Sequence, residues 1–138
     1  MSGSLIALVE DNADDEALTL RALTKHGIAN EIVVLRDGVE ALAFLLAADK
    51  PLPHLILLDL NLPRMSGLEV LQRLRLESRT RLLPVVILTS SNEERDLING
   101  YRLGANSYVR KPVDFVQFSE AVHQLGLYWL VLNQTPPR

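Results

Sequence analysis

The chain has 138 residues, of which 48% are hydrophobic and 22% are charged, and its formal net charge is −3. This size and balance are typical of one soluble globular domain, so we expect a single domain over residues 1–138. The acidic charge argues against a nucleic-acid partner, and the absence of cysteine excludes disulfides, cysteine-ligated metals and a thiol nucleophile. The sequence contains no apolar segment of transmembrane length and no signal-peptide pattern. We therefore expect a cytoplasmic protein without a membrane partner.

Five short apolar runs alternate along the chain with segments of helical periodicity. The runs predict strands at residues 5–9, 31–35, 55–58, 84–88 and 107–110. The intervening segments predict helices that begin near Asp14, Asp37, Ser66, Ser91 and Asp114. Strands that alternate with helices imply an α/β fold with a parallel sheet covered on both faces. Right-handed crossovers favour a doubly wound, flavodoxin-like sheet of strand order 2-1-3-4-5.

One strand ends on an acid. The apolar run 55–58 is followed directly by Asp59, and Pro63 then prevents further strand pairing because it has no N–H. Ser66 and Glu69 have the spacing of a capping box, which predicts a helix start. We expect Asp59 at the exit of the strand, where the chain meets water, because a charge is poorly tolerated in a core. Taken alone, Asp59 is explained equally well as an ordinary turn acid.

Polar side chains end three further predicted strands, namely Glu10 with Asp11, then Thr89, then Lys111. Because parallel strands deliver their carboxyl ends to one edge of the sheet, these side chains should converge with Asp59 in one cleft. Each has an ordinary alternative role: the acids suit a helix N-terminus, threonine suits a strand, and lysine suits a surface. Complementary chemistry at four separate strand ends favours a functional site.

Three carboxylates in one cleft would raise one another's pKa unless a cation lay among them. Mg²⁺ suits a site of few carboxylates that shares its ligands with a phosphoryl group. Asp59 can then act as a nucleophile and form an aspartyl phosphate. Lys111 would pair with a phosphoryl oxygen, and the Thr89 hydroxyl would donate to another.

These residues lie in motifs that resemble those of response-regulator receiver domains of two-component signalling, over nearly the full length of the chain. The motifs are Leu-Val-Glu-Asp at 8–11, Leu-Leu-Asp-Leu-Asn-Leu-Pro at 57–63 with Gly67, Ile-Leu-Thr-Ser at 87–90, and Tyr-Val-Arg-Lys-Pro at 108–112. Each motif alone is weak, whereas their combined order and spacing are highly specific.

The resemblance implies a role for each matching residue. Asp59 would accept a phosphoryl group from the phosphohistidine of a sensor histidine kinase. Asp11, Asp59 and the backbone carbonyl of Asn61 would bind Mg²⁺ directly, and Glu10 would bind it through water. Lys111 and Thr89 would contact the phosphoryl group, and Tyr108 would act as the aromatic switch. Tyr108 would change the face made by the helix near 91–101, the strand at 107–110 and the last helix. A half-buried edge-strand aromatic is the alternative for Tyr108.

The resemblance also implies a signalling protein that catalyses its own phosphorylation and dephosphorylation, rather than an enzyme with a separate substrate. Three motifs are similar to the small regulators of phytochrome histidine kinases, which tend to be dimeric: residues 37–45, residues 60–64 and the Tyr-Trp pair at 128–129. Residues 125–132 are apolar nearly all round and belong to a C-terminal extension of about 125–138. This extension either packs on its own domain or forms a homodimer interface.

Other functions remain open from the sequence. A phosphohydrolase of the haloacid-dehalogenase type also uses aspartate, Mg²⁺, a hydroxyl residue and lysine. In that family a second aspartate follows the nucleophile by two positions, whereas Asn61 stands here. A phosphorylation-silent receiver-like scaffold is another alternative. An FMN carrier is less favoured, because no Gly/Ser/Thr-rich phosphate loop follows the first strand.

Overall fold

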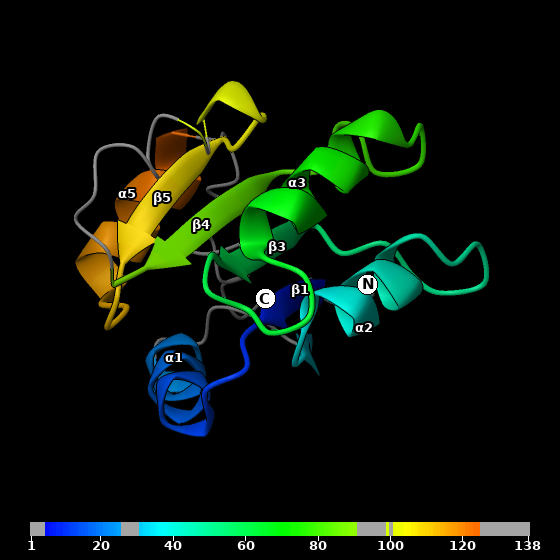
Figure 1. Ribbon diagram of the computed structural model, residues 1–138. Helices are drawn as coiled ribbons and strands as arrows, with labels where there is room; N and C mark the ends of the chain where they lie inside the picture. Colours follow the sequence, from blue (N-terminus) through cyan, green and yellow to red (C-terminus); the bar gives the residue numbers. More distant parts are fainter. Residues whose placement is uncertain (1–4, 26–30, 91–98, 100, 125–138) are drawn as a thin grey trace, which may run out of the picture.

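A computed structural model describes residues 5–25, 31–90, 99 and 101–124. Its parallel strands are β1 (Leu5–Val9), β2 (Glu31–Leu35), β3 (Leu55–Asp59), β4 (Val85–Thr89) and β5 (Ser107–Arg110). They pair in the order β2-β1-β3-β4-β5 (Figure 1), so the predicted doubly wound topology is confirmed. The described helices are α1 (Ala13–Lys25), α2 (Gly38–Leu45), α3 (Gly67–Leu76) and α5 (Phe115–Gln124).

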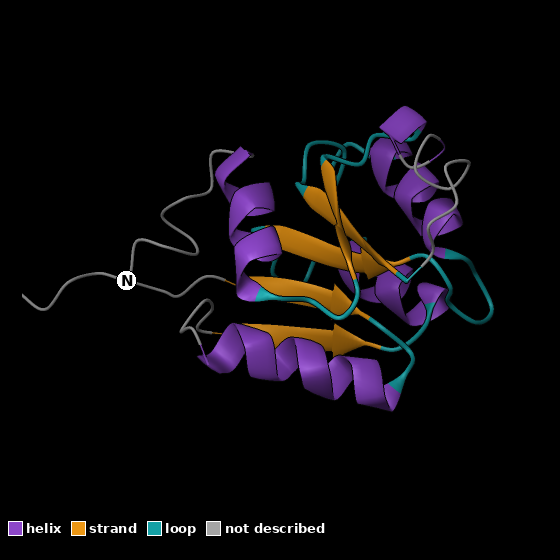
Figure 2. Ribbon diagram, turned by 90° about the vertical axis from the view of Figure 1, so that its left-hand side faces the viewer, coloured by secondary structure: helices purple, strands orange, loops and turns teal. Residues whose placement is uncertain are grey.

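Helices cover both faces of the sheet, as Figure 2 shows from the side. On one face, Leu23 of α1 and Phe118 of α5 pack against the buried side chains that β1 and β3 direct to that face. On the other face, Leu45 of α2 and Leu71 of α3 pack against the alternate side chains of the same strands. β3 and β4 are buried along their whole length, because they are central strands with a helix layer on each side.

Local capping signals place α2 and α3 where the sequence predicts them. Asp37 caps α2 by accepting a hydrogen bond from the Glu40 N–H at 2.7 Å. Ser66 and Glu69 form the expected reciprocal capping box at the start of α3. The first part of the predicted helix from Ser91 (residues 91–98) and the extension at 125–138 lie outside the described residues, whereas Asn99, Tyr101 and Arg102 at the end of that helix are helical.

The Arg75 side chain ties the end of α3 to the loops around it. Its guanidinium donates to the carbonyl oxygen of Gly104 at 2.7 and 3.0 Å and to that of Leu83 at 2.8 Å. Gly104 has a φ of 99°, which an L-residue rarely adopts, and a Cβ there would press against the Arg75 side chain. Burial lowers the pKa of this guanidinium below its usual value. Arg75 therefore holds the segment that leads into β5.

None of the helices among the described residues is long and apolar enough to cross a membrane.

Candidate functional site

Strand register brings the predicted site residues to one edge of the sheet. β1 and β3 are neighbours with Val9 paired to Leu58, so the residues that follow each of them lie side by side. β4 lies on the other side of β3. The Lys111 N–H donates to the Thr89 carbonyl at 2.9 Å, which carries the β4–β5 ladder one residue beyond β5. The predicted convergence of the strand ends is therefore present in the structure.

Three acids form the centre of this site. Glu10, Asp11 and Asp59 each place a carboxylate oxygen within 4.8 Å of the other two. Glu10 is fully buried, while Asp11 is exposed, so the cluster reaches from the core to the surface. Hard carboxylate oxygens at this spacing fit a divalent cation such as Mg²⁺, which uses a few carboxylates and keeps several waters.

The position of Asp59 corrects one expectation from the sequence. Asp59 is the last residue of β3 and is only 3% exposed, instead of standing in water beyond the strand. The core tolerates the charge because both carboxylate oxygens are held. Oδ1 accepts a hydrogen bond from the Asn61 N–H at 3.2 Å, and Oδ2 accepts one from Lys111 Nζ at 3.0 Å.

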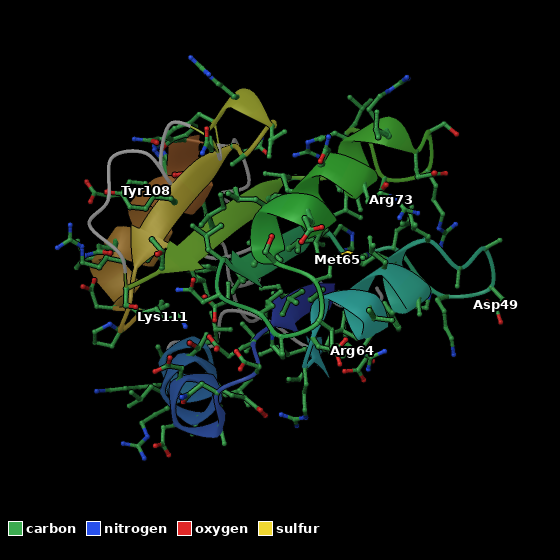
Figure 3. All side chains as sticks on the ribbon, viewed as in Figure 1. Asp49, Arg64, Met65, Arg73, Tyr108 and Lys111 are labelled. Atoms are coloured by element: carbon green, nitrogen blue, oxygen red, sulfur yellow. The ribbon has the colours of Figure 1, made fainter. Side chains whose placement is uncertain are left out.

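Lys111 is the cation at the centre of the acids, and Figure 3 shows it between β5 and α1. Its Nζ lies 2.8 Å from Glu10 Oε1, 3.0 Å from Asp59 Oδ2 and 3.0 Å from Asp15 Oδ2. The Lys111 side chain is 9% exposed; its ammonium donates hydrogen bonds to Asp15 and Asp59 and forms an ion pair with Glu10. The alternative of Lys111 as a solvated surface charge is thereby excluded.

The site perturbs the proton affinity of two of its members. Burial raises the pKa of Glu10 to about 7; Lys111 opposes this rise and Asp59 adds to it. For Lys111, burial alone would lower the pKa, but the contacts with Glu10, Asp15 and Asp59 together outweigh it and raise the pKa. Ionisable groups held in this way are typical of functional sites.

Asp15 is the site residue that the sequence analysis missed. It stands in the first turn of α1 among Asp14 and Glu16, where all three acids suit the helix dipole equally. Asn12 caps this turn through its Oδ1, which accepts a hydrogen bond from the Asp15 N–H at 2.9 Å. Only the placement of α1 beside Lys111 distinguishes Asp15 from its neighbours, so no local signal in the sequence could have identified it.

Glycine allows the chain to pass closely behind Asp59. The Gly67 N–H donates to the Leu60 carbonyl at 2.9 Å, and a Cβ on Gly67 would overlap the carbonyl oxygen of Asp59. The start of α3 is therefore packed directly on the residue that carries the carboxylate. In the loop before α3, Arg64, which is labelled in Figure 3, forms an ion pair with Asp37 at 3.3 Å.

The two remaining predicted residues lie on adjacent strands. Thr89 is the last residue of β4 and is 1% exposed, which places it at the site edge as predicted. Tyr108 lies on β5, half-buried, and packs against the α2 and α3 side of the core rather than within the acidic cluster. It lines a surface cavity of about 490 Å³ together with Tyr101, Arg110 and Gln117. The structure thus joins Thr89 to the acidic edge and leaves Tyr108 outside it.

The chain is similar to known proteins across most of its length. A family model described as the response regulator receiver domain matches residues 6–123. The probable methanogenesis regulatory protein FilR2 of Methanothrix harundinacea is 39% identical over 135 residues, covering 96% of this chain and 87% of FilR2. The response regulator Rcp1 of Synechocystis is 38% identical over 130 residues, covering 91% of this chain and 88% of Rcp1.

Solved structures give the same result. The bacteriophytochrome response regulator AtBRR superposes with a TM-score of 0.84 at 49% identity, over 95% of this chain and 98% of that one. The Mn²⁺-bound form of Rcp1 superposes with a TM-score of 0.75 at 36% identity, over 98% of this chain and 99% of that one. The Rcp1 crystal structure shows that a relative of this fold holds a divalent metal ion.

Proposed function

Because the chain belongs to the response regulator receiver domain family, we propose that it is phosphorylated on Asp59 by the phosphohistidine of a sensor histidine kinase. Receiver domains are signalling proteins that act with such kinases. The observation that carries the proposal is the position of Asp59, whose Oδ2 lies 3.0 Å from Lys111 Nζ within the carboxylate cluster. Burial and these hydrogen bonds hold the Asp59 carboxylate in place to act as the nucleophile.

The reaction transfers a phosphoryl group from nitrogen to oxygen. An Asp59 carboxylate oxygen attacks phosphorus, the O–P bond forms, and the N–P bond breaks with its electron pair returning to the imidazole nitrogen. Charge moves from the carboxylate onto the phosphoryl oxygens. Lys111 is already bonded to Oδ2, so one of its N–H groups can follow that charge to a phosphoryl oxygen. The Thr89 hydroxyl would donate to another phosphoryl oxygen.

The same site would hold Mg²⁺. Asp11 and Asp59 would bind it directly with the Asn61 carbonyl, and Glu10 would bind it through water. The cluster of three carboxylates within 4.8 Å supports this assignment. When bound, the cation neutralises negative charge on the acids and on the incoming phosphoryl group. The protein would catalyse its own phosphorylation and dephosphorylation with the help of that cation, since every side chain in the scheme except the donor histidine belongs to this chain.

Phosphorylation would act on the surface through Thr89 and Tyr108. Movement of Thr89 toward the phosphoryl group would vacate space at the end of β4, and Tyr108 on the neighbouring strand would turn inward. The cavity beside Tyr108 is lined by residues of β5 and α5, which supports a change on this face. The aspartyl phosphate supplies the contacts that favour one of the two arrangements.

The kinase partner we propose is a bacteriophytochrome, on the similarity to AtBRR. We also propose a single receiver domain with an extension at 125–138 that forms a homodimer, because residues 125–132 are apolar nearly all round. Truncation after Gln124 should convert the dimer to a monomer in light scattering. An unchanged mass would contradict the role of the extension.

Intact-mass measurement after incubation with acetyl phosphate tests the phosphorylation. The wild type should gain a single phosphoryl adduct that requires Mg²⁺, and Asp59→Asn should gain none. Asp49→Asn is the matched control, because Asp49 is an exposed loop acid far from the site (Figure 3). An adduct that persists in Asp59→Asn would move the acceptor elsewhere. No adduct from acetyl phosphate or from phosphorylated kinases would favour the silent scaffold.

A further inference from the structure

Asp15 differs from the other acids that contact Lys111. Glu10 and Asp59 belong to the cluster that fits a divalent cation, whereas Asp15 does not. Asp15 comes from α1, and its Oδ2 accepts a hydrogen bond from Lys111 Nζ at 3.0 Å across 96 positions of sequence. Its side chain is 37% exposed, while that of Glu10 is fully buried and that of Asp59 is 4% exposed.

A cation in the cluster changes what Lys111 experiences. A bound cation neutralises part of the negative charge of Glu10 and Asp59, and it also repels the Lys111 ammonium. Two of the three ion pairs of Lys111 are thereby weakened together. The Asp15 carboxylate keeps its full negative charge as the counterion of Lys111, because Asp15 does not belong to the cluster.

We propose that Asp15 is a positioning residue that holds Lys111 in the site when a divalent cation occupies Glu10, Asp11 and Asp59. This inference rests on the proposed function and deepens it. Asp15 lets the cation and the lysine share one cleft, so that both charges face the carboxylate of Asp59. Without Asp15, Lys111 would compete with the cation for Glu10 and Asp59, and the cation would bind more weakly.

Metal binding without any phosphodonor tests the inference. Mn²⁺ serves as the probe, because the loss of its free-ion EPR signal reports the dissociation constant, and Mg²⁺ is then measured by competition. Asp15→Asn should raise the dissociation constant for Mn²⁺ about fivefold, the equivalent of about 1 kcal/mol for a partly exposed ion pair. Asp14→Asn is the matched control, since Asp14 is an exposed acid in the same helical turn and its loss removes the same charge.

A double-mutant cycle with Lys111→Met shows whether Asp15 acts through the lysine. In that background, Asp15→Asn should change the affinity for Mn²⁺ no more than Asp14→Asn does. Asp15→Glu should retain near wild-type affinity, because the partly exposed position accommodates one extra methylene and the charge is kept. Circular dichroism confirms that each variant is folded.

Two results would overturn the inference. One is an equal shift in Asp14→Asn and Asp15→Asn, which would mean that only overall charge matters. The other is an Asp15→Asn effect that is as large with Met as with Lys at position 111, which would make Asp15 a direct partner of the cation. Both are measured without phosphorylation, so they are separate from a failure of Asp59 to accept a phosphoryl group.

Discussion

Replacement of Lys111 by methionine should destabilise the metal-free protein and make its stability depend strongly on Mg²⁺. Methionine keeps most of the length of the side chain and removes the ammonium. Glu10 and Asp59 would then be left buried beside each other and beside Asp11, with no countercharge. A divalent cation bound to the same acids supplies that countercharge from another position.

The magnitude follows from burial. The Lys111 side chain is 9% exposed, and its partners Glu10 and Asp59 are fully buried and 4% exposed. Removing one member of a buried ion pair costs about 3–5 kcal/mol, because the remaining charge is uncompensated. Uptake of a proton by one acid limits this loss, so we expect about 3 kcal/mol. A cation at about one hundred times its dissociation constant would restore about 2.7 kcal/mol.

Urea unfolding followed by circular dichroism, in EDTA and in excess Mg²⁺, measures both quantities. The gain from Mg²⁺ should be larger in Lys111→Met than in the wild type, since the ammonium no longer repels the cation. Lys50→Met is the control, because Lys50 is exposed and adjoins Asp49, which Figure 3 shows far from Lys111. Equal free energies of unfolding for Lys111→Met and the wild type in EDTA would refute the account of Lys111 as the countercharge of this cluster.

Two further substitutions test the packing around the site. Gly67→Ala should cost about 2 kcal/mol and slow phosphorylation, because the added Cβ must displace the backbone of Asp59. Urea unfolding measures the loss of stability, and the initial rate of phosphorylation measures the slowing. A free energy of unfolding and a rate equal to those of the wild type would disprove the close approach of Gly67 to Asp59. Arg75→Met should cost about 2–3 kcal/mol, since it leaves the Gly104 carbonyl without its donor. Arg75→Lys should recover only part of this stability, because lysine lacks the planar guanidinium group with its several N–H donors. If Arg75→Met unfolded at the same urea concentration as the wild type, the hydrogen bonds of Arg75 would add no stability.

The fold was predictable because its signals are local. Short apolar runs match the burial of strands between two helix layers, and the Ser66–Glu69 box marks the start of α3 within one residue. The edge of the sheet that carries the site follows from the parallel direction of the strands. The start of the predicted helix at Ser91 lies outside the described residues, so that helix start stays a prediction.

The sequence by itself determined which chemistry reaches the edge of the sheet: acids at the ends of β1 and β3, a hydroxyl at the end of β4 and an ammonium just beyond β5. Strand ends are set by local pattern, so this much needs no tertiary information. Tertiary structure alone decided that Asp59 is buried and that Asp15 joins Lys111. Those contacts join residues 52 and 96 positions apart. They depend on how α1 and the end of β5 pack against the sheet, which short-range periodicity does not specify.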